Sequence, residues 1–196
     1  TAASTIAKIP YLIMSSLALL IMPVIVEAVK GEMAKARRLV REINRYILLL
    51  LVPAAVLIST KATNTVALFY KSDYIAAAEP LRLLVIAAVL ATIVTAVLTM
   101  TIAAGNSTMP IAITAAMIIG SLKLSQTLIP SYGMVGAATA MLITFGLGAV
   151  VSVAYLVAKL GTFVYLKSIL RIAFAAAITY LVAANVHIAN KFMLPL

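Results

Sequence analysis

Side chains that could carry out chemistry are few in this chain. It has five acidic residues, one histidine (His187) and no cysteine. The acidic residues all fall at the ends of apolar segments or in the joints between them: Glu27, Glu32, Glu42, Asp73 and Glu79. The lack of cysteine excludes disulfides and thiolate chemistry, and one histidine cannot form a histidine-based metal cluster. We therefore expect no metal site, no cofactor and no enzymatic activity.

Lys123 is the strongest candidate for a functional cation, because it lies inside an apolar segment. It is about two helical turns before Ile129, roughly 9 Å at 1.5 Å per residue. Gln126 follows three residues later, so a helix would place both side chains on one face. The ammonium could bind an anionic group of a substrate in a cavity. The alternative is that the lysine stem runs along apolar surface and brings the charge to the polar boundary.

Three further ionisable residues lie near the ends of apolar segments. Lys61 and Lys8 are candidates for the same cavity, and anchoring at a polar boundary is the alternative for both. His187 is expected to be a boundary residue rather than a proton relay.

The elements that must position these residues are membrane-spanning helices. Hydrophobic residues make up 65% of the chain and charged residues 10%, against about a quarter charged in soluble domains. Residues 83–122 carry no charge at all. Because about 20 residues span a bilayer, that stretch must hold two spans, joined by a tight turn at residues 105–108.

Charge-free lengths and helix breakers predict an all-α bundle of six transmembrane helices in a single unit, residues 1–196. The predicted spans are residues 9–26, 39–60, 83–104, 109–129, 135–158 and 172–189. The fifth span has a small residue at every fourth position, a pattern that lets another helix approach closely. This helix-packing stripe consists of Gly136, Ala140, Thr144, Gly148 and Ser152.

The net charge of +10 is placed as expected for a membrane protein and does not indicate nucleic-acid binding. Much of it lies in one basic joint: Lys30, Lys35, Arg37, Arg38, Arg41 and Arg45. With six spans, one side of the membrane holds nine basic residues and the other side five. The positive-inside rule therefore places the basic joints in the cytoplasm of a multi-pass plasma-membrane protein, with lipid as a partner. Both ends of the chain are then expected outside, which favours at least one preceding helix in a larger protein.

One segment carries a family resemblance, LIPSYGMVGAATAMLITF at residues 128–145. It resembles the polysaccharide flippases of the multidrug/oligosaccharidyl-lipid/polysaccharide exporter superfamily, which have a proline, aromatic–glycine and glycine–alanine–alanine signature at such a joint. The matching positions are Pro130, Tyr132, Gly133, Gly136, Ala137 and Ala138. The resemblance runs from about residue 9 to residue 159 and includes the helix–basic joint–helix opening with Pro10, Pro23, Gly31 and Pro53.

This resemblance implies the C-terminal lobe of a 12- to 14-helix transporter whose N-terminal lobe would be its partner. The implied function is alternating-access flipping of a polyprenyl-pyrophosphate-linked oligosaccharide, and Lys123 would then meet the pyrophosphate. A drug/cation antiporter of the same superfamily and a non-transporting structural membrane subunit remain alternatives. An antiporter calls for an acidic site inside the bundle, and the apolar segments of this chain contain none.

Overall fold

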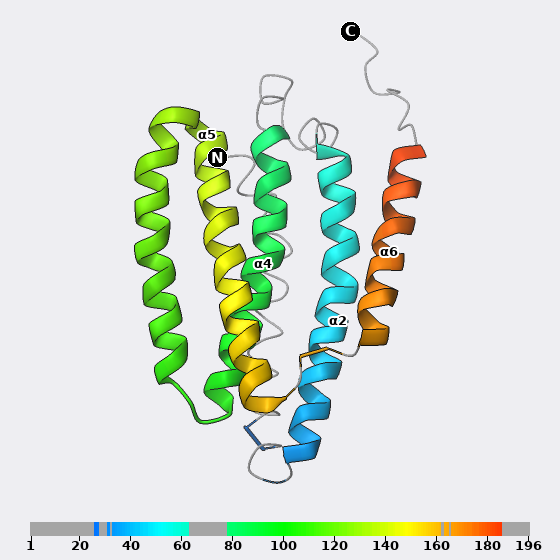
Figure 1. Ribbon diagram of the computed structural model, residues 1–196. Helices are drawn as coiled ribbons and strands as arrows, with labels where there is room; N and C mark the ends of the chain where they lie inside the picture. The colour runs from blue at the N-terminus through cyan, green and yellow to red at the C-terminus, as the bar shows by residue number, and fades with distance from the viewer. Residues whose placement is uncertain are drawn as a thin grey trace, which may run out of the picture.

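The computed structural model describes residues 26–27, 31, 33–62, 78–161, 163–164 and 166–185. Four helices make up this part of the chain: α2 (Met33–Thr60), α4 (Ala78–Ala103), α5 (Thr108–Leu160) and α6 (Leu166–Asn185). They stand side by side as one bundle (Figure 1). The first predicted span lies outside the described residues except for Val26, and residues 186–189 of the sixth lie outside them as well.

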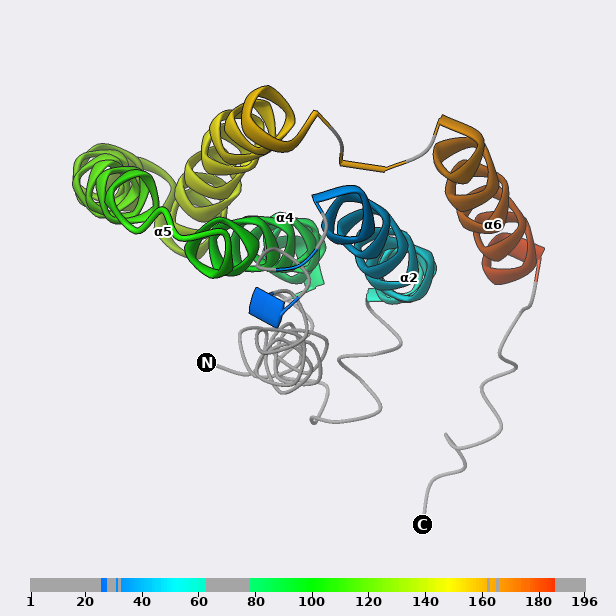
Figure 2. The ribbon, with the colours of Figure 1, turned by 90° about the horizontal axis from the view of Figure 1, so that it is seen from below.

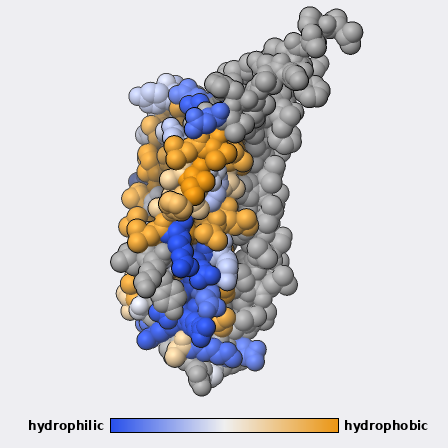
Figure 3. Space-filling view, turned by 90° about the vertical axis from the view of Figure 1, so that its right-hand side faces the viewer, coloured by the Kyte–Doolittle hydropathy of each residue, from blue (hydrophilic) through white to orange (hydrophobic). Residues whose placement is uncertain are grey.

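The predicted all-helical membrane fold is confirmed for the described residues. Three helical segments are long and apolar enough to cross a membrane: Arg37–Thr60, Glu79–Ala103 and Thr108–Lys159. A shorter apolar stretch, Leu170–Ala183, lies in α6. Large apolar side chains stand exposed on the outside of the bundle, among them Leu50 at 60% and Val150 at 69%. A hydrocarbon solvent makes such exposure favourable. Figure 3 shows an apolar band between hydrophilic atoms at the lower and upper parts of one face.

Two helices begin earlier than the charge-free segments predicted. α2 begins at Met33 instead of residue 39, and α6 begins at Leu166 instead of residue 172. The basic residues assigned to joints therefore occupy the first turns of these helices. A count of charge-free residues finds only the part of a helix that crosses hydrocarbon. It misses polar turns that continue the same backbone pattern, here supported by the Arg38–Glu42 ion pair at 3.1 Å.

α5 covers the ranges predicted as the fourth and fifth spans. Its 53 residues would measure about 80 Å if straight, far more than the roughly 30 Å of hydrocarbon. The helix instead reverses at Gly133, which has non-helical angles of φ 53° and ψ −126°. We call residues 108–132 the first arm and residues 134–160 the second arm; Figure 1 shows them lying side by side below the bend.

The bundle packs around α4. Contacts join α4 to α5 and to α2, and join α2 to α6. The main apolar core combines side chains of three helices: Val40, Ile47 and Leu51 of α2, Ala96, Val97, Met100 and Ala103 of α4, and Leu156 of the second arm. Seen along the helices, the first arm lies at one edge of the bundle and α6 at the opposite edge (Figure 2).

Polar groups within α4 are satisfied by the helix itself. The hydroxyls of Thr92, Thr95, Thr99 and Thr101 each donate a hydrogen bond to the carbonyl four residues earlier, at 2.8–2.9 Å. In a bilayer no water is available to pair with these hydroxyls. This pattern therefore lets α4 carry four threonines through the hydrocarbon without an unpaired donor.

Candidate functional site

A groove with polar groups in its lining lies near the upper end of the described bundle, between α2, α4 and α6. Its volume is about 580 Å³. The side chains lining it are Val52, Ala55, Val56, Ser59, Thr60, Arg82, Ile86, Val89, Leu90 and Tyr180. We call it the α2–α4–α6 groove. It has apolar walls with a few polar groups, the usual composition of a ligand site.

The polar groups of this groove come from three helices. Ser59 lies in the last turn of α2, Arg82 in the first two turns of α4, and Tyr180 towards the end of α6. They meet because the end of α2 and the start of α4 lie at the same end of the bundle, and α6 packs against α2.

Arg82 gives the groove its charge. Its side chain is exposed. It is the one charged residue among the described side chains that line the groove, and it forms no ion pair with the described residues. A guanidinium is always protonated and offers paired N–H donors that match the oxygens of a phosphate or carboxylate. The groove therefore favours an anionic ligand.

Two hydroxyl groups in the groove differ in their hydrogen bonding. The Thr60 hydroxyl donates to the Val56 carbonyl at 2.7 Å, as threonines in helices commonly do. The Ser59 oxygen is buried and has no hydrogen-bond partner among the described residues. A buried hydroxyl without a partner is unfavourable.

The opposite end of α2 carries the basic residues. Lys35, Arg37 and Arg38 are exposed, whereas Arg41 and Arg45 are half-buried. The Arg45 guanidinium lies 4.7 Å from the centre of the Tyr46 ring, a cation–π contact. About 21 Å of helix, the rise of fourteen residues, separates Arg45 from Ser59. The basic residues of α2 and the groove therefore lie at different heights along the bundle. Lys30, the remaining member of this group, lies outside the described residues.

A buried amide lies close to that basic end. Asn44 is 3% exposed, and its side-chain nitrogen donates to the Phe163 carbonyl at 3.3 Å and lies 3.7 Å from the Met100 sulfur. It thereby connects α2, α4 and the segment between α5 and α6. Sequence reasoning overlooked Asn44, Arg82 and Ser59. The sequence feature that could have identified them is a polar side chain at a position whose neighbouring helical turns are apolar.

None of the described sequence candidates for a substrate cavity lines the groove. Lys123 and Gln126 are exposed on the first arm, at the edge of the bundle (Figure 2). Lys61 is half-buried and follows Thr60 directly, one residue beyond the groove. Lys8 and His187 lie outside the described residues. The cavity role of Lys123, Gln126, Lys61 and Lys8 stays a prediction, as does the boundary role of His187.

The five members of the small-residue stripe are all buried: Gly136, Ala140, Thr144, Gly148 and Ser152. At least two of them face the first arm. A Cβ atom on Gly148 would lie 2.5 Å from the Met117 sulfur, and one on Gly136 would lie 2.6 Å from the Leu128 carbonyl carbon. At Gly136 and Gly148 the stripe therefore lies at the seam between the arms of α5.

The chain was compared with known proteins at three levels. No family model matches it, and no curated protein matches it. Among solved structures, it is similar to the lipid II flippase MurJ in its inward closed conformation, with a TM-score of 0.77 and 17% sequence identity. The match covers 97% of this chain and 42% of the MurJ chain. At this identity the likeness establishes the fold alone: the bundle has the architecture of the matched part of that structure.

Proposed function

We propose that this chain forms one lobe of a flippase that moves a lipid-linked anionic substrate across the membrane by alternating access. The observation that carries the proposal is the fold shared with a lipid II flippase over 97% of the chain. Because the chain spans 42% of that structure, the proposal includes a second lobe that completes the transport path. We propose transport alone for this chain, without a catalytic step.

The chemistry of the α2–α4–α6 groove supports an anionic, lipid-linked substrate. Arg82 would bind phosphate oxygens, and Tyr180 would add a hydroxyl contact. The apolar walls formed by Val52, Val56 and others would accept part of the lipid. Within this class we propose a polyprenyl-pyrophosphate-linked oligosaccharide, following the resemblance at residues 128–145.

A drug/cation antiporter fits the groove less well. A cationic substrate requires an acidic partner in a dry site, because an unpaired charge there is expensive. No described residue lining the groove is acidic, and Arg82 would repel a cation.

We infer the orientation of the bundle in the membrane from its basic end. In Figure 1 the start of α2, the turn between α4 and α5, and the start of α6 lie at the lower end. The basic residues toward that end include Lys35, Arg37, Arg38, Arg41, Arg45 and Lys159. We propose that this end faces the cytoplasm of the plasma membrane. The α2–α4–α6 groove then lies near the outer face.

Transport in reconstituted vesicles tests the proposal. The intact protein would be placed in liposomes with a fluorescent polyprenyl-pyrophosphate oligosaccharide, and a membrane-impermeant quencher would report flipping. We expect Arg82→Gln to lower the rate at least about tenfold, as loss of one charge-assisted contact implies. Arg37→Gln, which removes an exposed cation in the first turns of α2 at the opposite end, is the matched control and should stay within about twofold. Absence of flipping by the unmodified protein would refute the function, and an unaffected Arg82→Gln would refute the site.

A further inference from the structure

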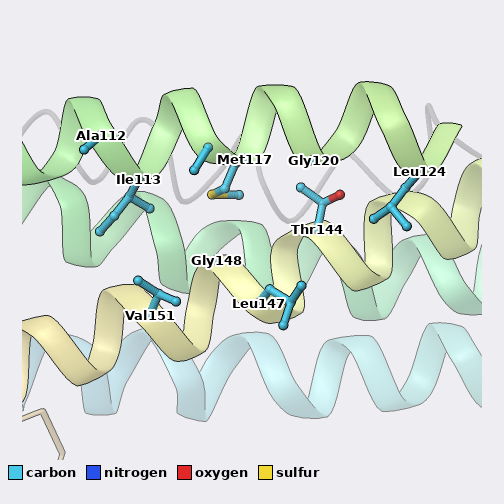
Figure 4. A pocket seen from close by; sticks show the side chains of 10 residues that line it. Ala112, Ile113, Met117, Gly120, Leu124, Thr144, Leu147, Gly148 and Val151 are labelled. Atoms are coloured by element: carbon cyan, nitrogen blue, oxygen red, sulfur yellow. The ribbon is translucent and has the colours of Figure 1, made fainter. Parts of the chain in front are cut away.

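A second groove lies between the two arms of α5. Its volume is about 370 Å³. The first arm contributes Ala112, Ala116, Met117 and Gly120, and the second arm contributes Leu147 and Val151. We call it the arm groove. Figure 4 shows these side chains lying between the two arms, with Met117 directed toward the turn that holds Gly148.

The dimensions of the arm groove suit one hydrocarbon chain. From Ala112 to Leu124 the first arm rises about 18 Å, which is close to the roughly 15 Å depth of one leaflet. The lining is apolar apart from Thr144, whose hydroxyl already donates to the Ala140 carbonyl at 2.8 Å. Residues next to the lining in sequence carry exposed apolar side chains, among them Ile119 and Val150. In a bilayer such a surface is in contact with lipid chains.

Polar residues continue the same helix face above the groove. Lys123 lies seven residues, or two turns, after the lining residue Ala116, and Thr127 and Ser131 follow at intervals of four. All three side chains are exposed. The Thr127 hydroxyl is within hydrogen-bonding distance of the Leu124 carbonyl at 3.0 Å, and Lys123 forms no ion pair with the described residues. One face of the first arm is therefore apolar and concave below Lys123 and polar above it.

We propose that the arm groove and Lys123 bind one anionic phospholipid of the surrounding bilayer. One acyl chain lies between the arms, and the phosphate accepts a hydrogen bond from the Lys123 ammonium, with Thr127 and Ser131 beside the headgroup. The positive charge at the end of the groove complements the negative charge of the phosphate. The single-leaflet length of the groove fits an acyl chain better than a longer polyprenyl chain.

The position of the first arm separates this lipid from the proposed transport substrate. The first arm lies at the edge of the bundle, and α2 and α6 lie beyond α4 (Figure 2). None of the described residues lining the arm groove also lines the α2–α4–α6 groove. The inference therefore does not depend on the proposed function.

Selection of the lipid must come mainly from the charge. Moving an acyl chain from the bilayer into an apolar groove exchanges one hydrocarbon environment for another, so the hydrophobic effect contributes little. The groove supplies close packing around one chain, and Lys123 supplies the preference for an anionic headgroup. These two contributions can be removed separately.

Native mass spectrometry of the intact protein tests the headgroup contact. After delipidation, the protein would be titrated with phosphatidylglycerol or phosphatidylcholine, and the first bound lipid measured. We expect the unmodified protein to prefer phosphatidylglycerol by about tenfold, the effect of one charge-assisted hydrogen bond, and Lys123→Gln to abolish the preference. Lys159→Gln, which removes an exposed lysine at the far end of the second arm, is the matched control and should retain it. An undiminished preference in Lys123→Gln would overturn the proposal.

A groove-filling variant tests the chain contact. A Cβ atom on Gly120 meets nothing within 4 Å, so Gly120→Leu can fill the groove without displacing backbone. We expect Gly120→Leu to weaken binding of both lipids at least about tenfold, whereas Ala115→Leu, exposed and outside the lining, should leave it unchanged. Equal binding by Gly120→Leu and the unmodified protein would overturn the groove as the site. Displacement of phosphatidylglycerol by an equimolar polyprenyl phosphate would overturn the phospholipid as occupant.

Discussion

Gly136 packs directly against the backbone carbonyl of Leu128, across the bend that joins the two arms of α5. A Cβ atom at position 136 would lie 2.6 Å from the Leu128 carbonyl carbon and closer still to its oxygen. Gly133 lies between them at φ 53°. The two glycines of the 128–138 segment thus have separate physical roles: one supplies the bend, and the other allows the arms to close beneath it.

The first prediction concerns the stability of this bend. Gly136→Ala would force backbone apart, since the neighbour is a carbonyl group and not a flexible side chain. We expect a loss of at least about 2 kcal/mol, and a loss of about 1–3 kcal/mol for Gly133→Ala from backbone strain. Thermal unfolding in detergent micelles would measure both. Gly120→Ala is the control: its Cβ meets nothing within 4 Å, so it should be neutral or stabilising by up to about 1 kcal/mol. Equal melting temperatures for Gly136→Ala and Gly120→Ala would contradict the packing.

The second prediction concerns the buried amide of Asn44. Asn44→Leu removes the donor to the Phe163 carbonyl at 3.3 Å and leaves that carbonyl without this partner. Interhelical hydrogen bonds in membranes contribute about 0.6–2 kcal/mol, and we expect a destabilisation in that range, with faster proteolysis between α5 and α6. Asn185→Leu is the control, because its exposed amide bonds to the Leu181 carbonyl of its own helix at 2.9 Å. If both variants unfold alike, Asn44 does not connect the helices as described.

The third prediction concerns Lys123 in transport. Because Lys123 lies on the outer arm and does not line the α2–α4–α6 groove, Lys123→Met should retain transport within about twofold. It removes the cost of holding a charge near hydrocarbon, so membrane abundance should be unchanged or higher. The measurement is transport per inserted molecule in cells that lack their own flippase. Loss of transport at normal membrane abundance, with partial recovery in Lys123→Arg, would contradict this expectation and show that Lys123 acts in the substrate cavity.

The fourth prediction concerns topology. The chain has no cysteine, so single cysteines can be introduced at exposed positions and labelled with an impermeant reagent in intact cells. Gly31 and Ser107 lie at the basic end of the bundle, and Glu79 and Ser131 lie at the other end. We expect labelling at Glu79→Cys and Ser131→Cys, and labelling at the other two sites only after permeabilisation. Labelling of Gly31→Cys from outside would reverse the orientation.

The fifth prediction concerns the extent of the transport unit. The 196-residue chain covers 42% of the flippase structure it resembles, and an alternating-access path requires two lobes that move against each other. We expect the purified 196-residue chain to insert into vesicles and to flip no substrate. A vesicle preparation of the intact protein serves as the positive control. Flipping by the 196-residue chain alone would rule out the one-lobe proposal.

Much of the secondary structure could be predicted from the sequence, because the bilayer imposes a length and a polarity on each segment. The uncharged run at residues 83–122 required two helices and a turn, and α4 and the first arm of α5 meet at that turn, residues 104–107. The polar first turns at Met33 and Leu166 could not be read from the predicted spans, because hydrocarbon thickness does not limit how far a helix continues beyond the membrane. The proline–glycine segment at residues 128–138 indicated a joint, which the structure shows to be a bend at Gly133 within α5.

The site could not be predicted in the same way. α4 is apolar around its whole circumference, so its sequence does not distinguish a side that meets another helix from one that meets lipid. Ser59, Arg82 and Tyr180 meet only because α2, α4 and α6 pack side by side. Lys123 was chosen because it lies inside an apolar segment, and only the tertiary structure placed its helix at the edge of the bundle. Local chemistry and bilayer thickness determined which residues are helical, whereas packing between helices decided which of them share a cavity.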